Sequence, residues 1–245
     1  MRAALAVLTI LLLLVWSPFP APAGEAPEKA LSDEAELSFV DTSGNTDTTT
    51  FAFRNTLKYR FTEALLGTWK LGVLYGKDQG AKNAERYGTE IRLDFLVTER
   101  IYTFAYGGWF RDPFAGIDDR YYGGAGAGYK FLTGPVHTLA GELGLTYTSE
   151  KYTDGTDEGY LGGRAFAEYR YAITEKNRFT QSLEFLYDFD DSDNYNVNSE
   201  TAVVAALTDR FALKASYVVK YDHRPVPATL DDTDATLAMA LLFTY

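Results

Sequence analysis

The stretch Phe51–Phe61 has the sequence FAFRNTLKYRF, in which two kinds of side chain alternate. Its odd positions are apolar or aromatic apart from Asn55, and its even positions are small, polar or cationic. Because successive side chains of a β-strand point to opposite faces of the sheet, this period of two predicts one strand with an apolar face and a charged face. Such a strand fits at the boundary between an apolar and a polar environment.

The same alternation continues to the end of the chain, and a shorter segment with Ala35, Leu37 and Phe39 precedes it. Together these segments predict twelve strands. The apolar face of the fifth segment is assigned to Tyr102, Phe104, Tyr106 and Phe110. None of the apolar faces carries a charge, whereas nearly all of the opposite faces do.

Charge-free faces on so many strands favour contact with lipid, where one Lys or Arg at mid-depth costs roughly 2–4 kcal/mol. Each segment also has about 10 residues or slightly more, the length that a tilted strand needs to cross a bilayer. Two soluble alternatives are a barrel around a wide apolar cavity and a two-sheet sandwich, whose strands usually have about 5–6 residues. We predict an all-β fold, a transmembrane antiparallel up-and-down β-barrel of about twelve strands over residues 34–245.

Residues 1–23 have the parts of a secretory signal peptide. Arg2 supplies a positive start, Ala3 to Val15 form an apolar run, and the small residues Ala21-Pro22-Ala23 follow. The alternative, a membrane anchor helix, needs about 20 apolar residues, and this run is shorter. We expect cleavage after Ala23, a polar linker over residues 24–33, and location in the cell outer membrane of a Gram-negative bacterium.

The connections between the segments alternate in length. Tight turns are predicted at residues 62–64, 98–100, 134–136, 175–177 and 208–210. Longer polar loops are predicted at residues 76–85, 112–119, 149–159, 190–194 and 222–234. Short turns on one side and longer loops on the other are typical of outer-membrane barrels.

Aromatic side chains gather near both ends of the segments, as expected where rings meet lipid headgroups. The band on the turn side is assigned to Tyr59, Phe61, Tyr102, Phe131, Tyr171, Phe179, Phe211, Phe243 and Tyr245. The band on the loop side is assigned to Phe39, Phe51, Tyr75, Tyr87, Phe110, Tyr121, Tyr147, Phe189, Tyr195 and Tyr221. The aromatic end of the chain, with Phe243 and Tyr245, resembles the C-terminal signal that the bacterial barrel-assembly machinery recognises.

The opposite faces supply the charges expected to line the lumen. The cations are Arg54, Lys58, Lys70, Arg92, Arg164, Arg170, Lys214 and Lys220. The anions are Glu90, Asp94, Glu142, Glu168, Glu184 and Glu200. Eight cations nearly balance six anions, so a paired polar interior is one interpretation. The other is a narrow, weakly anion-favouring pore, because twelve strands lie between the filled eight-strand barrel and the open porin.

Three further groups of residues invite functional hypotheses. Gly124, Gly126 and Gly128 are expected to face the lumen, where they leave room or permit a bend in the strand. His223, near Asp222, Asp231 and Asp232 in the last loop, suggests a rim hydrolase, although a solvated acidic loop explains the same residues. His137 is expected to be an ordinary turn residue.

Asp190, Asp191 and Asp193 suggest a site for hard cations, which could bridge the barrel rim to lipopolysaccharide phosphates. The alternative is that these loops are only solvated connections.

Composition limits the partners. The net charge of −11 argues against nucleic acid, because phosphate contacts need a basic surface. The chain has no cysteine, so the fold depends on strand pairing and burial rather than on disulfides. We expect a monomer without a cofactor, in contact with outer-membrane lipid and lipopolysaccharide.

Four motifs are distinctive in combination: Ser43-Gly44-Asn45-Thr46-Asp47, Arg111–Asp118 with Arg120, Gly126–Tyr129, and Glu142–Gly144 with Tyr147 and Glu150. Together they resemble the YdiY-like proteins, a family known as salt-induced outer membrane proteins of unknown function. The resemblance covers most of the chain after the signal peptide. It implies an outer-membrane barrel with a structural or salt-stress role, and it supplies neither catalytic residues nor a substrate.

Overall fold

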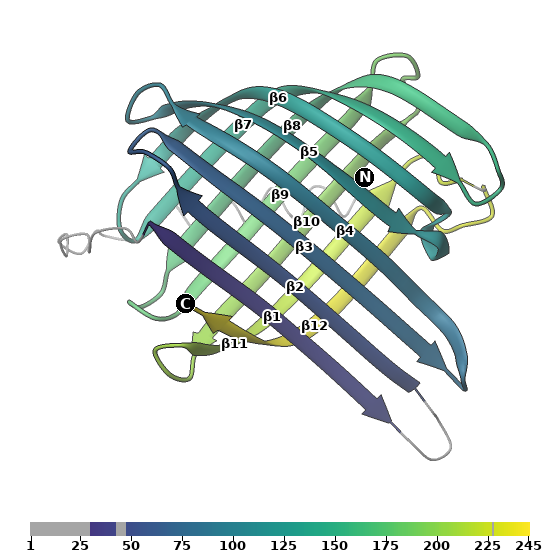
Figure 1. Ribbon diagram of the computed structural model, residues 1–245, viewed down its shortest axis with the longest axis horizontal. Coiled ribbons are helices and arrows are strands. Elements are labelled where there is room, and N and C mark those ends of the chain that lie inside the picture. Colours follow the sequence, from purple (N-terminus) through teal and green to yellow (C-terminus); the bar gives the residue numbers. More distant parts are fainter. Residues whose placement is uncertain (1–29, 43–47, 227) are drawn as a thin grey trace, which may run out of the picture.

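The computed structural model describes residues 30–42, 48–226 and 228–245. They form one closed antiparallel barrel, in which each strand pairs with its sequence neighbours and the last strand pairs with the first (Figure 1). The strands are β1 (Leu31–Thr42), β2 (Thr48–Arg60), β3 (Leu65–Asp78), β4 (Ala81–Leu96), β5 (Ile101–Asp112), β6 (Ile117–Thr133), β7 (His137–Tyr152), β8 (Asp157–Ala172), β9 (Arg178–Asp188), β10 (Tyr195–Ala206), β11 (Phe211–Asp222) and β12 (Thr233–Thr244). The predicted all-β, up-and-down barrel of twelve strands is confirmed. No helix in these described ranges is long and apolar enough to cross a membrane.

The first strand begins earlier than predicted. Residues 31–33 were assigned to the linker, but they pair with β2 in the register Leu31↔Tyr59 to Asp33↔Leu57. The carboxylate of Asp33 also accepts a hydrogen bond of 2.7 Å from the side-chain amide of Asn55. A polar segment can join the barrel here because its strand partner satisfies its backbone. The predicted signal peptide and residues 24–29 of the linker lie outside the described residues.

The large apolar side chains of most strands lie on the outer face of the barrel. Leu143, Leu237 and Met239 are among the most exposed, at 72%, 74% and 73%. Aromatic rings expected near the strand ends, such as Tyr59, Phe61, Tyr121, Tyr147 and Phe189, are exposed as well. An outer face of this kind is suited to lipid, because burial of so much apolar surface would otherwise require a second layer of protein.

The face assigned to the aromatic residues of β5 was wrong. Tyr102 and Phe104 are buried inside the barrel, and Ile101, which alternates with them, is exposed. The neighbouring strand explains the difference, because a Cβ atom placed on Gly124 would lie 2.7 Å from the Tyr106 ring and one on Gly126 would lie 2.7 Å from the Phe104 ring. Gly124, Gly126 and Gly128 face the lumen as expected, and the rings of β5 occupy the space that these glycines leave. Phe110, at the other end of β5, lines the internal cavity. Tyr102 and Phe110 therefore do not belong to the aromatic bands.

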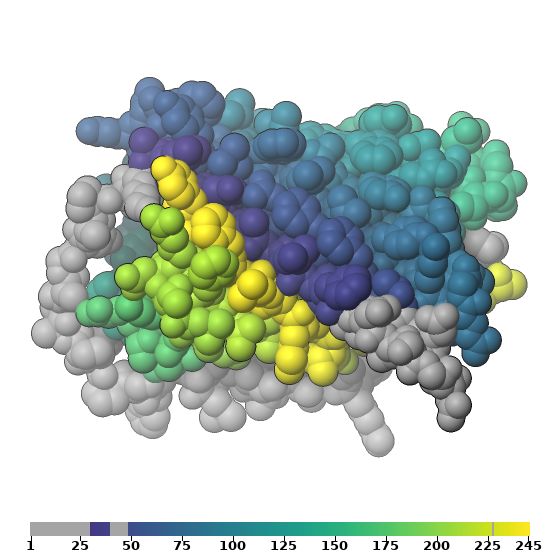
Figure 2. All heavy atoms as spheres, turned by 60° about the horizontal axis from the view of Figure 1, so that its bottom comes forward, coloured from purple at the N-terminus to yellow at the C-terminus, as the bar shows by residue number. Residues whose placement is uncertain are grey.

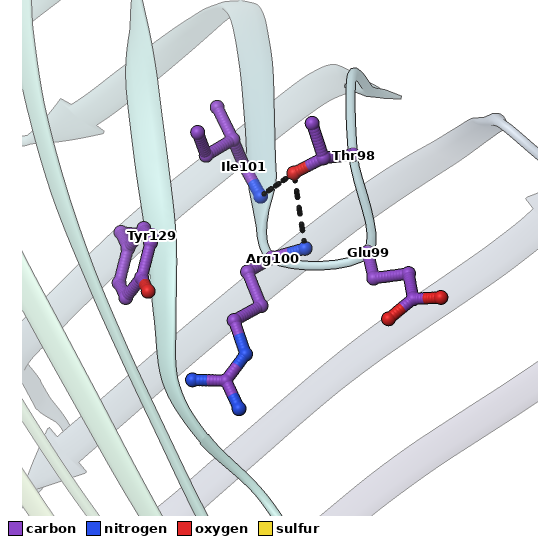
Figure 3. A pocket seen from close by; sticks show the side chains of 5 residues that line it. All are labelled: Thr98, Glu99, Arg100, Ile101 and Tyr129. Carbon is purple, nitrogen blue, oxygen red and sulfur yellow. Dashed lines mark hydrogen bonds between the residues drawn. The ribbon is translucent and has the colours of Figure 1, made fainter.

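The predicted tight turns are confirmed, and four of the five share one device. A threonine Oγ1 accepts hydrogen bonds from the backbone N–H groups two and three residues later at Thr62, Thr98, Thr174 and Thr208. For Thr98 these distances are 3.3 Å from Arg100 and 2.9 Å from Ile101 (Figure 3). The hollow beside this turn is lined by the turn residues and Tyr129. A side-chain acceptor of this kind satisfies backbone donors that the reversal of the chain leaves without a ladder partner.

Two of the five predicted long loops are confirmed, because residues 190–194 lie between β9 and β10 and residues 223–232 lie between β11 and β12. The other three predictions were wrong in extent, because strands continue into 76–85, 112–119 and 149–159. The stretch 76–85 contains only a two-residue turn, Gln79-Gly80, and both residues have positive φ angles, of 49° and 79°. This is the backbone that a tight hairpin requires. Similarly, β7 continues to Tyr152 and β8 begins at Asp157. The alternation is lost in these extensions because beyond the apolar band both faces of a strand can be polar.

Candidate functional site

The lumen contains all fourteen side chains that the alternation assigned to it. Nine of them line an internal cavity: Arg54, Lys58, Lys70, Glu90, Glu168, Arg170, Glu200, Lys214 and Lys220. The other five form a group that we call the arginine cluster: Arg92, Asp94, Glu142, Arg164 and Glu184. The lumen thus has two halves of different character, one open and one filled.

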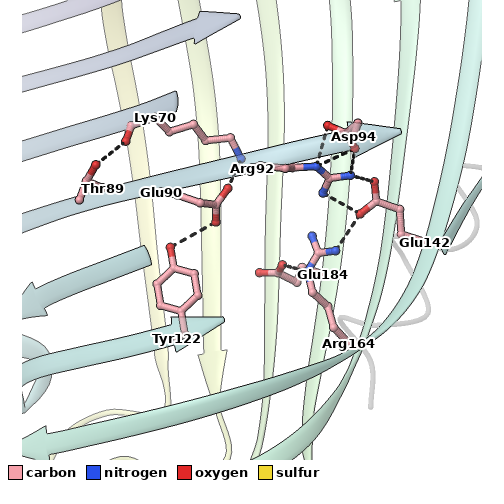
Figure 4. Close-up of polar contacts among 9 residues, drawn as sticks. All are labelled: Lys70, Thr89, Glu90, Arg92, Asp94, Tyr122, Glu142, Arg164 and Glu184. Carbon is pink, nitrogen blue, oxygen red and sulfur yellow. Dashed lines mark hydrogen bonds and ion pairs between the residues drawn. The ribbon is translucent and has the colours of Figure 1, made fainter. Parts of the chain in front are cut away.

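The arginine cluster joins strands that are not neighbours. Arg92 on β4 contacts Asp94 and Glu142 at 2.6 Å each, and Arg164 on β8 contacts Glu142 and Glu184 at 2.7 Å each (Figure 4). Because β5 and β6 separate β4 from β7 in the sheet, the Arg92–Glu142 contact spans the interior of the barrel. The side chain of Glu142 is only 5% exposed and accepts bonds from both arginines.

Aromatic rings complete this filled half. The guanidinium of Arg92 lies 4.4 Å from the centre of the Phe104 ring, and that of Arg164 lies 4.8 Å from the Phe166 ring. The hydroxyl of Tyr102 donates a 2.8 Å hydrogen bond to Glu142. Cation–ring contacts are strongest where water is excluded, so these rings stabilise the cluster as well as filling space. This side of the lumen is a packed polar core.

The other half of the lumen is open, and the cavity in it has a volume of about 1630 Å³. Its walls come mainly from β1–β4 and β8–β12. The lining includes Ser32 and Lys58 near the turn-side strand ends, and Asn83 and Asp112 near the loop-side ends. The cavity therefore extends along most of the barrel, to one side of the arginine cluster.

Most charges in the cavity wall are paired. Lys214 lies 2.7 Å from Glu36 and 3.0 Å from Glu200, and Lys70 lies 2.9 Å from Glu90. Two lysines differ, because neither Lys58 nor Lys220 forms an ion pair within 4.0 Å with another described residue. Arg170 and Glu168 are 3.6 Å apart and both nearly half exposed, so solvent weakens that pair.

Sequence reasoning missed several lumen residues. Glu34, Glu36 and Arg178 line the cavity, and Arg178 pairs with Glu34. Glu34 and Glu36 were not predicted because only the apolar face of the first segment was assigned, although their even positions indicate the lumen. Arg178 was not predicted because it begins a strand directly after a tight turn.

The acidic residues at the rim are largely bound within the chain. Asp191 pairs with Arg224 and accepts a 3.0 Å hydrogen bond from the backbone N–H of Asp193. Asp154 accepts hydrogen bonds from the hydroxyl and the backbone N–H of Thr156, and these bonds lower the pKa of its carboxyl group. The described part of the chain contains no group of three or more His, Cys, Asp or Glu side chains placed to hold a metal ion. The structure does not bring Asp190, Asp191 and Asp193 together as a cation site.

The two histidines lie against aromatic rings. His223 stacks on Tyr195 with ring centres 4.5 Å apart, and its Nδ1 lies 2.7 Å from the hydroxyl of Tyr221. His137 stacks on Tyr171 at 4.9 Å and lies 2.8 Å from the Tyr169 hydroxyl. For His223, the neighbouring hydroxyl is a phenol rather than the serine or water that a hydrolase would activate.

This fold, a closed twelve-strand antiparallel barrel with an apolar exterior and a charged interior, is similar to that of outer-membrane porins and channels. An outer membrane channel from Pseudomonas putida F1 matches it with a TM-score of 0.57 and 12% identity, over 94% of this chain and 100% of that one. The NanC porin matches with a TM-score of 0.52 and 8% identity, over 87% of this chain and 97% of that one.

The chain belongs to the DUF481 family of proteins of unknown function, whose model matches residues 35–245. The uncharacterized protein YdiY of Escherichia coli (strain K12) is 26% identical over 214 residues, which cover 87% of this chain and 83% of that protein. The resemblance drawn from the sequence motifs is therefore confirmed.

Proposed function

We propose that this protein is a narrow passive channel for small polar solutes in the outer membrane. The observation that carries the proposal is the cavity of about 1630 Å³, whose lining includes residues near both ends of the strands. A barrel of intermediate strand number can leave such a path when part of its interior is not filled by side chains. The fold-level likeness to an outer-membrane channel supports the same proposal.

The wall charges favour polar solutes over a strongly selected ion. Most of the lysines, arginines and carboxylates are paired, so they present dipoles to the path rather than a large net charge. Lys58 and Lys220, one toward each end of the cavity, are lining cations that form no ion pair within 4.0 Å with another described residue. The expected result is a weak preference for anions.

The test is conductance of purified protein in planar lipid bilayers. We expect discrete current steps with a weak anion preference that Lys58→Glu or Lys220→Glu reverses in the reversal potential. Lys176→Glu is the matched control, because Lys176 makes the same charge change in an exposed turn outside the cavity. If correctly folded protein repeatedly gives no current steps in bilayers, the proposed channel function is wrong.

A closed structural barrel is the second candidate function. The arginine cluster favours it, since a paired and packed half-lumen stabilises the wall rather than opening a path.

For either function we infer that the end of β12 is the signal for insertion by the barrel-assembly machinery. There the Phe243 ring contacts the Phe211 ring, with centres 5.3 Å apart.

A further inference from the structure

A lysine reaches across the lumen near the loop-side ends of the strands. The Nζ atom of Lys220 on β11 lies 5.3 Å from the centre of the Phe110 ring on β5. Strands β6–β10 separate β5 from β11 on one side and β4–β1 with β12 on the other, so the two strands belong to opposite walls. Figure 2 shows the outside of one wall, in which β12 (yellow) lies between β11 (yellow-green) and β1 (purple). The contact of Lys220 with Phe110 therefore narrows the lumen at this level.

Lys220 lacks a counter-ion in the described part of the chain, where no carboxylate lies within 4.0 Å of it. Asp234 is its partner across the β11–β12 ladder, and Asp222 follows it by two positions on β11, yet both lie beyond that distance. Asp222 instead accepts a 3.0 Å hydrogen bond from the backbone N–H of Arg224. An ammonium partly removed from water without a counter-ion is costly, and one ring face offsets only part of that cost. A bound anion would supply the missing charge.

Two arginines approach the same ring. The Cζ atom of Arg120 on β6 lies 5.8 Å from its centre, and that of Arg86 on β4 lies 6.0 Å from it. Arg120 contacts Glu150, and Arg86 donates from Nε to Asp112 at 2.5 Å. These two pairs are neutral, so the uncompensated charge beside the ring is that of Lys220, which suits a monoanion. Arg86 lines the cavity, and a guanidinium has two terminal nitrogens besides Nε that can donate to a ligand.

Apolar side chains line the cavity at the same end. Leu74 lies opposite Arg86 in the β3–β4 register, and Val218 shares the lumen face of β11 with Lys220. Phe114, in the short 3-10 turn after β5, lines the cavity as well. The turn-side end instead carries hydroxyl side chains between its charges: Ser32, Thr180 and Ser182. A ligand at the loop-side end therefore meets a free cation and an apolar wall together.

We propose that this end of the lumen is a binding site for aromatic monocarboxylates. The carboxylate accepts charge-assisted hydrogen bonds from Nζ of Lys220 and from a terminal nitrogen of Arg86. The aromatic body packs on the Phe110 ring and against Leu74 and Val218, because a flat ring fits where opposite walls approach each other. The inference rests on the proposed channel function only for the route of entry, and it names a class of solute for that channel.

Binding is measured with 4-fluorobenzoate and protein in lipid nanodiscs, where the width of the fluorine resonance reports exchange with a slowly tumbling site. We expect wild-type protein to broaden the resonance several-fold more than empty nanodiscs, and Lys220→Gln to remove that excess. Lys58→Gln is the matched control and should keep it. Lys58 also lines the cavity without an ion pair within 4.0 Å to another described residue, but it lies near the turn-side end. Equal broadening by wild type and Lys220→Gln would overturn the site.

The class of ligand is tested with further probes. Neutral 4-fluorobenzamide should show no broadening beyond that in empty nanodiscs. Unlabelled benzoate should displace 4-fluorobenzoate at several-fold lower concentration than acetate or inorganic phosphate. If acetate competes as well as benzoate, the aromatic part of the proposal is wrong, and if phosphate does so, the carboxylate specificity is wrong.

The aromatic contact is tested with Phe110→Leu, which keeps an apolar side chain but removes the ring. This variant should weaken binding of 4-fluorobenzoate several-fold, and unchanged binding would contradict packing on Phe110. Val218→Thr replaces it if Phe110→Leu does not migrate as a folded barrel on an unheated gel.

The site and the channel fail separately. If bilayers show no current steps but broadening that depends on Lys220 remains, the channel is wrong and the site stands. If the protein conducts but does not broaden the 4-fluorobenzoate resonance, the channel stands and the site is wrong.

Discussion

Glu142 on β7 illustrates how single residues hold the filled half of the lumen together. Its carboxylate accepts bonds from Arg92, Arg164 and Tyr102, which come from three other strands. Removal of one member of a buried charge group leaves its partners uncompensated, which is more costly than removal of the whole group.

We expect Glu142→Gln to lower the free energy of unfolding by about 3 kcal/mol, because two buried arginines then face a neutral amide. Denaturant unfolding of the barrel in lipid vesicles measures the change. Glu168→Gln is the matched control, since Glu168 is 45% exposed and lies 3.6 Å from its partner Arg170. If Glu168→Gln lowered the free energy of unfolding as much as Glu142→Gln, burial of Glu142 would not explain the effect.

At the scale of the element, β5 and β6 form a complementary pair. The rings of Tyr102, Phe104 and Tyr106 project from β5 over the glycines of β6. A Cβ atom on Gly126 would clash with the carbonyl oxygen of Leu143 and lie 2.6 Å from the Cα atom of Gly144, so the backbone of β7 would have to move.

Gly126→Ala should therefore lower the free energy of unfolding by about 1–3 kcal/mol through overpacking. The same vesicle unfolding experiment measures it. Gly72→Ala is the control within another strand, because nothing lies within 4 Å of its added Cβ. That substitution should leave stability unchanged or raise it by about 0.5–1 kcal/mol, since alanine restricts the unfolded chain. Equal destabilisation by both would show that the rings and glycines are not specifically packed.

At the scale of the whole molecule, closure of the sheet decides the physical behaviour. Each described strand pairs with its neighbours, and the ladder between β1 and β12, from Glu34↔Thr244 to Leu37↔Leu241, completes the circle. Sheets closed in this way leave few edges for detergent or other chains to attack.

We expect the mature protein to fractionate with the outer membrane and to migrate faster on a denaturing gel when unheated than after boiling. The folded barrel stays compact in detergent until heat opens it, which explains the difference. Recovery as a soluble periplasmic protein, with a far-ultraviolet spectrum rich in helix, would contradict both the location and the fold.

Local pattern alone was sufficient for the strands and for most of their faces. The period of two in Phe51–Phe61 arises from the pleat of a single strand, so it needs no knowledge of neighbours. The lumen charges follow for the same reason, since Arg54 or Glu142 must face away from the apolar positions beside it. The strand extensions past the apolar band were not predicted, because both faces of the strand are polar there and the period of two disappears.

Only the tertiary structure decided what depends on contacts between strands. Hydropathy places Tyr102 and Phe104 with lipid, and it is the glycines of the adjacent β6 that offer them space inside. The ion pair of Arg92 with Glu142 and the pairing of β1 with β12 bring together residues that are far apart in the chain. A one-dimensional pattern records which face a side chain occupies, but the partner it meets there is set by the closure of the barrel.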